Sequence, residues 1–194
     1  FLQHKIKKNF LFINNLTSTR KILNNKKKSL NLIISKSGNT LETIANSNLF
    51  LSKNQKNIFI TQNKKNYLRT LANQLKSEVF NHNNFIGGRY SVLSEVGMLP
   101  AALMGLNPKK FRRFNKLIKN KRFIDSLITN VSNIFSLHKQ KKFNSIILNY
   151  DECSNNLFNW YQQLVAESLG KKGKGLLPVV STMPKDNHSL MQLY

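Results

Sequence analysis

Short apolar runs alternate with segments of helical periodicity along the chain. Apolar residues run together, as in buried strands, over 9–14, 30–34, 57–61, 143–150 and 176–181. Apolar side chains recur every three or four residues, as in helices, over 18–23, 41–49, 67–75, 123–137 and 153–169. This alternation predicts an α/β fold, a parallel sheet with helices on both faces. Ligands of such sheets gather at the carboxyl ends of the strands.

The loop after the second apolar run is rich in hydroxyl groups. Strand 30–34 leads directly into Ser35-Lys36-Ser37-Gly38-Asn39-Thr40, and the helical pattern follows at once. Backbone N–H groups at a helix start, with the helix dipole and these hydroxyls, can hold a phosphate group. The alternative is a plain helix cap made by Asn39 and Glu42, which leaves Ser35 and Ser37 unexplained.

A pair of glycines ending at Gly88 opens the next helical pattern. We expect one long helix from here to Leu103, kinked at Pro100. Arg89 would lie in its first turn, where a cation meets the positive end of the helix dipole and costs a few tenths of a kcal/mol. An anionic ligand would remove that cost, and so would an ion pair with Glu95.

The helix predicted over 153–169 carries the clearest candidate for chemistry. Its apolar stripe is expected to face a core, and Gly170 stands where a helix would end. Gln163 and Glu167 lie four residues apart, so both side chains project together on another face. The alternative is a surface ion pair between Glu167 and Lys171. The stripe consists of Leu157, Trp160, Tyr161, Leu164, Val165 and Leu169.

The basic segment 108–120 shows no strand pattern and is expected to connect two units, 1–107 and 108–194. Strand and helix alternate again in the second unit. It ends in a turn over 183–191 that we expect to lead into a helix capped by Asp186 or Asn187. His188 would then stand at a strand-to-helix junction, where a histidine taken alone is more often a surface residue than a catalyst.

The formal net charge of +23 raises the question of a nucleic-acid partner. The lysines are scattered in short runs, however, and asparagine is overabundant alongside lysine. We interpret most of this charge as solvated background at tolerant surface positions. Specific nucleic-acid binding is therefore not expected.

Length and cysteine content exclude several classes of protein. A chain of 194 residues can bury a core, and no apolar run reaches the roughly 18 residues of a membrane span. Its start lacks a signal peptide, so we expect a cytoplasmic protein.

The chain begins with Phe1 rather than Met, and we expect a longer translation product. Cys153, the one cysteine, fits neither a disulfide scaffold nor a zinc ribbon and is interpreted as a core or helix-start residue.

Motifs in a fixed order resemble those of the glucose-6-phosphate isomerase (phosphoglucose isomerase) family. They are Ser35-Lys36-Ser37-Gly38-Asn39-Thr40-Leu41-Glu42-Thr43, Gly87-Gly88-Arg89-Tyr90-Ser91, Gln162 to Lys171, and Asp186-Asn187-His188-Ser189. The resemblance covers nearly the whole chain. It implies two incomplete sugar-isomerase (SIS) domains, each a three-layer parallel sheet flanked by helices.

The resemblance also implies roles for particular residues and a homodimer that needs no cofactor or metal. Arg89 would steady the enediolate, and Glu167 would move a proton between C2 and C1, with Gln163 nearby. His188 would serve ring opening from the partner subunit. Substrate contacts are implied for Ser35, Lys36, Ser37, Thr40 and Gly88. One ionised glutamate and one permanent cation suit such an isomerisation.

The chain also departs from the family pattern. Ser37-Gly38-Asn39 replaces a threonine-rich version of the phosphate loop, and an earlier glycine- and serine-rich motif and a later lysine are absent. An SIS isomerase of another phosphosugar would share the phosphate loop without the other motifs. A non-catalytic SIS regulator would bind phosphosugar and have no need of Glu167.

Overall fold

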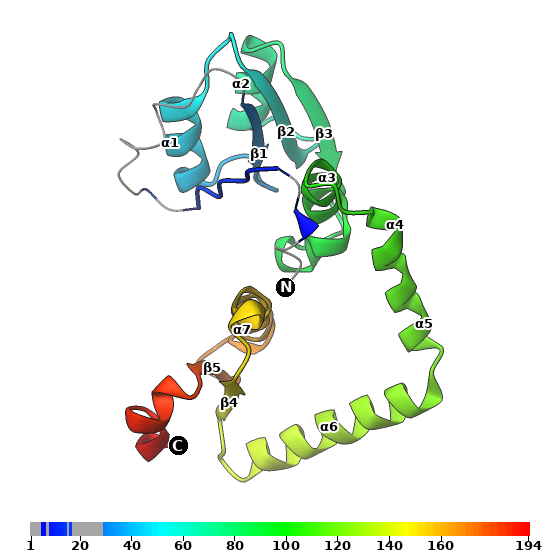
Figure 1. Cartoon of the computed structure of the whole chain (residues 1–194), viewed down its shortest axis with the longest axis vertical. Coiled ribbons are helices and arrows are strands. Elements are labelled where there is room, and N and C mark those ends of the chain that lie inside the picture. The colour runs from blue at the N-terminus through cyan, green and yellow to red at the C-terminus, as the bar shows by residue number, and fades with distance from the viewer. Residues whose placement is uncertain (1–4, 7, 15, 17–28) are drawn as a thin grey trace. The chain divides into compact units, whose positions relative to one another are not determined.

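The computed structural model describes residues 5–6, 8–14, 16 and 29–194 (Figure 1). The chain divides into two compact units, Lys5–Pro108 and Lys109–Tyr194. No helix within the described ranges combines the length and the apolar character that crossing a membrane requires.

A three-stranded parallel sheet in the order β1-β2-β3 forms the centre of the first unit. Ile33, Phe59 and Val79 are paired across it in register and share one face. The helices α1 and α2 connect successive strands, which confirms the α/β prediction (Figure 1). The elements are β1 Leu30–Ile34, α1 Leu41–Phe50, β2 Lys56–Gln62, α2 Tyr67–Gln74 and β3 Glu78–His82.

Both connecting helices pack on the same face of this sheet. Phe59 of β2 is fully buried against Leu68 and Ala72 of α2, and Ile44 of α1 packs against the same cluster. The reason is that right-handed crossovers put successive helices on one face when the strand order does not reverse. The carboxyl ends of the strands, which carry Ser35 and His82, consequently open at one edge.

The expected long helix after Gly88 is two shorter ones, so that prediction is wrong. A 3₁₀-helix covers Gly88–Leu93, and α3 covers Glu95–Leu103 with Pro100 inside it. Ser94 separates them because it adopts an extended conformation, and its hydroxyl accepts a hydrogen bond from the Val96 N–H at 3.3 Å. Serine is well suited to such a cap and therefore starts a new helix.

The second unit holds a two-stranded parallel sheet, β4 with β5, against which α7 packs. The predicted stripe of α7 is only partly covered, since Leu157 and Leu169 are about half exposed. Cys153 starts the segment, as expected, but is exposed rather than in a core. The elements are α4 Pro108–Phe111, a 3₁₀-turn Arg112–Phe114, α5 Asn115–Ile118, α6 Lys121–Lys139, β4 Asn144–Asn149, a 3₁₀-turn Glu152–Ser154, α7 Asn155–Leu169 and β5 Leu177–Thr182.

Two further predictions differ from the structure. Residues 9–14 are irregular, with Leu11 and Phe12 largely exposed, because an apolar run becomes a strand only where another strand pairs with it. The helix expected after Met183 is instead a pair of 3₁₀-turns, Lys185–His188 and Met191–Leu193. The helix predicted over 18–23 lies outside the described residues.

Candidate active site

The loop from Ser35 to Thr40 is a compact turn closed by its own hydroxyl groups. The Ser35 and Thr40 hydroxyls are hydrogen-bonded at 2.8 Å, and the Gly38 N–H donates to Ser35 Oγ at 3.2 Å. The Asn39 N–H donates to Ser37 Oγ at 3.2 Å. The hydroxyls of this loop therefore gather between the carboxyl end of β1 and the first turn of α1.

Gly38 fits this turn because it has no side chain. Its φ is +68°, and a Cβ there would stand 2.1 Å from Asn66 Oδ1. Asn66 is buried and caps α2, accepting from the Arg69 N–H at 2.9 Å. The loop and the start of α2 are thus packed against each other at a position that only glycine can occupy.

The capping alternative for this loop is wrong. Asn39 Oδ1 accepts a hydrogen bond from the Tyr67 N–H at 3.0 Å, and so it serves α2 rather than α1. Thr40 is the N-terminal flanking residue of α1 and makes no side-chain cap hydrogen bond. Within the described part of the chain, the residue that flanks the start of α1 therefore provides no side-chain cap. N–H groups in the first turn of a helix can then bind an anion.

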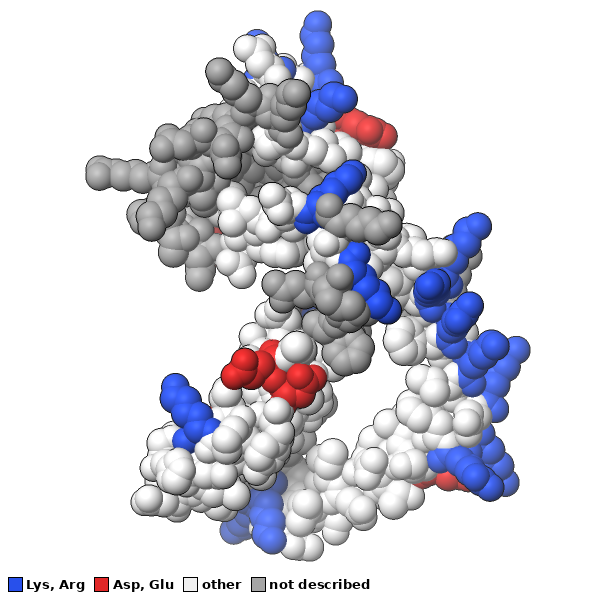
Figure 2. Space-filling view, in the orientation of Figure 1, with Lys and Arg blue, Asp and Glu red and all other residues white. Residues whose placement is uncertain are grey.

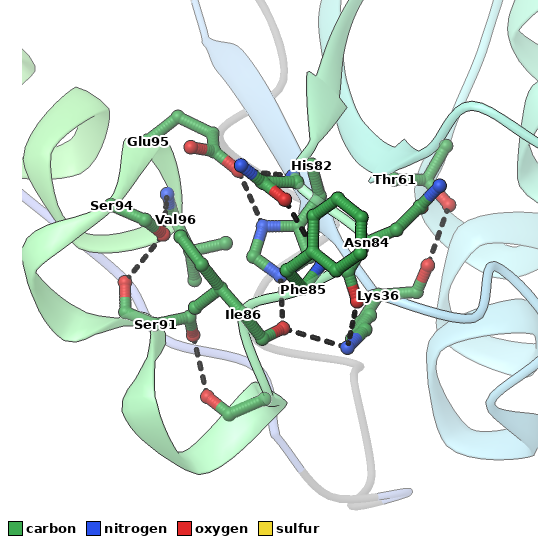
Figure 3. Close-up of polar contacts among 12 residues, drawn as sticks. Lys36, Thr61, His82, Asn84, Phe85, Ile86, Ser91, Ser94, Glu95 and Val96 are labelled. Carbon is green, nitrogen blue, oxygen red and sulfur yellow. Dashed lines mark hydrogen bonds and ion pairs between the residues drawn. The ribbon is translucent and has the colours of Figure 1, made fainter.

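Lys36 connects this loop to the turn before the glycine pair (Figure 3). Its amine donates to the backbone oxygens of Ile86 at 2.7 Å and Asn84 at 3.2 Å. The Lys36 carbonyl accepts two hydrogen bonds from the end of β2, one from the Gln62 N–H at 3.0 Å and one from the Thr61 hydroxyl at 3.3 Å. The two motifs of the first unit therefore lie side by side.

Arg89 is the second residue of the 3₁₀-helix Gly88–Leu93 and is half-buried. Its guanidinium lies 4.7 Å from the centre of the Tyr90 ring. Glu95, the carboxylate considered as its partner, contacts His82. A Cβ on Gly88 would meet nothing within 4 Å, so this chain leaves space beside the glycine that precedes Arg89.

Gln163 and Glu167 project together from α7, as their spacing predicts. The Gln163 side-chain amide donates to Glu167 Oε1 at 2.8 Å, and both side chains are exposed. This contact orients the carboxylate without burying it. The phosphate-type loop and Arg89 belong to the first unit, whereas Glu167 belongs to the second.

His188 is exposed and ends the 3₁₀-turn Lys185–His188. The sequence predicts a helix there capped by Asp186 or Asn187, but the Asp186 carboxylate accepts from the Ser181 hydroxyl at 2.8 Å and the Thr182 N–H at 2.7 Å. The Ser181 hydroxyl first, and then the Thr182 N–H, lower the pKa of Asp186 below its ordinary value. The turn that presents His188 is thus fastened to the end of β5.

A buried histidine that the sequence did not indicate stands beside the arginine motif. His82 is the last residue of β3, and its ring lies between Glu95 and the backbone oxygen of Ile86 (Figure 3). The strand itself was not predicted, because Val79 and Phe80 are its only strongly apolar residues. The sequence signal that could have indicated His82 is its place a few residues before the glycine pair that precedes Arg89.

Lysine and arginine side chains project from the surface, and many of them lie over α4, α5 and the start of α6 (Figure 2). The sequence from 108 to 122 contains no acidic residue. In the same view, the few acidic side chains form small separate groups.

Comparison with known proteins decides the family. A family model described as Phosphoglucose isomerase matches residues 3–175. The chain belongs to the phosphoglucose isomerase family. The resemblance seen in the motifs is thereby confirmed.

Curated relatives and a solved structure agree with this family. A glucose-6-phosphate isomerase from Methanocaldococcus jannaschii is 34% identical, over 96% of this chain and 50% of the relative. One from Mycoplasmopsis pulmonis is 33% identical, over 91% of this chain and 44% of the relative. The crystal structure of a hypothetical protein from Thermus thermophilus is similar with a TM-score of 0.79 and 28% identity, over 95% of this chain and 49% of that chain. The chain thus spans about half the length of these proteins.

Proposed function

We propose that this chain takes part in the interconversion of glucose 6-phosphate and fructose 6-phosphate through an enediolate, a step of glycolysis and gluconeogenesis. The observation that carries the proposal is the loop from Ser35 to Thr40, where hydroxyl groups gather beside a helix start that has no side-chain cap. Such a start favours a bound dianion through its N–H groups and dipole. The family membership supports a phosphosugar as that anion.

The proposed roles follow the chemistry of each side chain. Ser35, Ser37 and Thr40 hold the phosphate together with the α1 N–H groups. The guanidinium of Arg89 stabilises the enediolate, because it stays charged at any working pH. Glu167 transfers the proton between C2 and C1, and its hydrogen bond from Gln163 fixes the carboxylate for that transfer.

Several finer points belong to the same proposal. His188, presented by a partner subunit in a homodimer, assists ring opening, and Lys36 and Gly88 line the substrate site. The residues 1–107 and 108–194 correspond to parts of two SIS domains in a cytoplasmic enzyme. Neither a cofactor nor a metal has a step in this reaction, since one carboxylate can move the proton.

The test is turnover by the product of the complete open reading frame. The purified protein is expected to interconvert glucose 6-phosphate and fructose 6-phosphate, measured from both directions. Binding of these sugars without turnover would instead favour the SIS regulator. Turnover of a different phosphosugar alone would favour the other SIS isomerases, and salt-dependent binding of DNA without either would favour a nucleic-acid partner.

A further inference from the structure

His82 contacts the carboxylate of Glu95 in the interior of the first unit. It ends β3, where it is paired in register with Gln62, and its side chain is fully buried. Histidine at such a depth needs hydrogen-bond partners for both ring nitrogens, because an unmatched buried polar atom is costly. The structure supplies both partners, and neither belongs to the reaction as proposed above.

The two partners are both oxygen acceptors. Nδ1 of the ring contacts Glu95 Oε1, and Nε2 lies 3.2 Å from the backbone oxygen of Ile86 (Figure 3). A neutral imidazole has one N–H and can donate to only one of them, whereas the protonated ring donates to both. The ring thus joins the Glu95 carboxylate to the Ile86 carbonyl.

Glu95 is placed to remain ionised opposite this ring. It is the first residue of α3, where the helix dipole favours a negative charge, and Oε1 also accepts from the Asn83 N–H at 3.3 Å. Burial raises the pKa of Glu95, but hydrogen bonds from the backbone N–H groups and from His82 outweigh it, so the pKa lies below its ordinary value.

The Ile86 oxygen is held from two directions. His82 approaches it from the end of β3, and the Lys36 amine approaches it from the hydroxyl loop at 2.7 Å. Ile86 stands immediately before Gly87 and Gly88, whose backbone places Arg89. A glycine pair gives the chain little stiffness of its own. The 3₁₀-helix holds its own first turn, since the Tyr90 N–H donates to the Gly87 oxygen at 3.0 Å. The anchored Ile86 then sets the direction from which the chain enters that turn.

We propose that His82 is a positioning residue: with Glu95 it clamps the turn over 83–87 and thereby places Arg89 beside the phosphate-type loop. This inference rests on the proposed function, in which Arg89 stabilises the enediolate. A displacement of a catalytic group by about 1 Å can cost about 10²-fold in rate. Loss of the clamp is expected to lower kcat about 10- to 100-fold and to leave KM within about twofold, because the phosphate contacts are untouched.

Two substitutions separate the two contacts of the ring. In His82→Gln the amide nitrogen can reach the place of Nε2 and donate to Ile86, whereas in His82→Asn it reaches only the place of Nδ1. The clamp predicts that the glutamine variant keeps more activity than the asparagine variant. The matched control is His138→Asn, the same substitution at a histidine of α6 whose ring contacts the Phe143 ring. This control is expected to leave kcat unchanged.

A double-mutant cycle with Arg89→Lys tests whether the effect passes through Arg89. Positioning predicts that His82→Asn lowers kcat much less in the Arg89→Lys background than in the native one. Equal loss in both backgrounds would overturn the inference, and so would equal kcat for the two His82 variants. If the His82 variants do not fold, Glu95→Gln replaces them in the same cycle, with the same expectation and the same refuting outcome.

A readout without turnover keeps this inference separate from the proposed function. In His82→Asn, the amide hydrogens of residues 86–91 are expected to exchange with solvent at least about tenfold faster, while those of β2 keep their protection. Unchanged exchange in 86–91 means that the clamp does not exist, whatever the activity. Faster exchange in a protein that isomerises no phosphosugar refutes the proposed function and leaves the clamp standing.

Discussion

Gly38→Ala should unfold much of the first unit, and its cost can be worked out from the structure. A methyl group at this position would lie 2.1 Å from Asn66 Oδ1 and 2.2 Å from Asn66 Cγ. Asn66 cannot simply move aside, because it caps α2 and its amide donates to the Thr61 hydroxyl at 3.2 Å and to the Lys64 backbone oxygen at 2.9 Å. Removing the clash therefore means breaking this network.

The free energy of unfolding should fall by roughly 3 to 6 kcal/mol. Alanine at φ +68° costs about 1 to 2 kcal/mol of backbone strain. Loss of the α2 cap adds about 1 kcal/mol, and a buried amide without its partners adds about 1 to 3 kcal/mol. The measurement is urea unfolding followed by far-ultraviolet circular dichroism.

Gly173→Ala is the matched control for this prediction. Gly173 has nearly the same φ, +69°, but a Cβ there would meet nothing within 4 Å. Only the backbone strain should appear, about 1 to 2 kcal/mol. If Gly38→Ala costs no more than Gly173→Ala, the packing of the loop against Asn66 does not stabilise the unit, and the reasoning fails.

Two further predictions concern the isolated chain and acid stability. The 194-residue chain alone should not turn over fructose 6-phosphate, because the earlier phosphate motif and the later lysine of the family are absent from it. Measurable specific turnover by the purified chain would show this prediction wrong. The pKa of Glu95 is lowered in the folded state, so its stabilising effect should be present above its ordinary pKa and disappear as the pH falls through the folded value. Urea titrations over this acid range should show a smaller loss of stability in Glu95→Gln than in the native chain; equal losses would contradict the prediction.

The strand and helix pattern was accessible from the sequence because apolar runs are short and clearly spaced. Leu30–Ile34 and the helix after Thr40 were found within a residue or two. The segment 9–14 is as apolar as a strand, but among the described residues it forms none, because pairing depends on distant parts of the chain. β3 was missed for the opposite reason, since its stability comes from pairing with β2 rather than from its own composition.

The contacts of the candidate site also fall into those that the sequence predicts and those that it does not. The contact between Gln163 and Glu167 followed from helical spacing, because residues four apart share a face. The contacts of Lys36 with Ile86 and of His82 with Glu95 join segments that are separated in sequence and meet only in the folded sheet. Spacing rules cannot find such contacts. The sequence accordingly indicated Arg89 but not the residues that hold its turn.

Exchange of the C2 hydrogen of glucose 6-phosphate with deuterated solvent tests the central claim, that Glu167 is the base, most directly. The measurement compares the native product of the complete open reading frame with Glu167→Gln, which keeps the shape of the side chain and removes its basicity. We predict that exchange falls by about 10⁴-fold or more, at or beyond the top of the range for general-base catalysis, while a binding titration shows nearly unchanged affinity. Exchange at close to the native rate in Glu167→Gln would contradict the account.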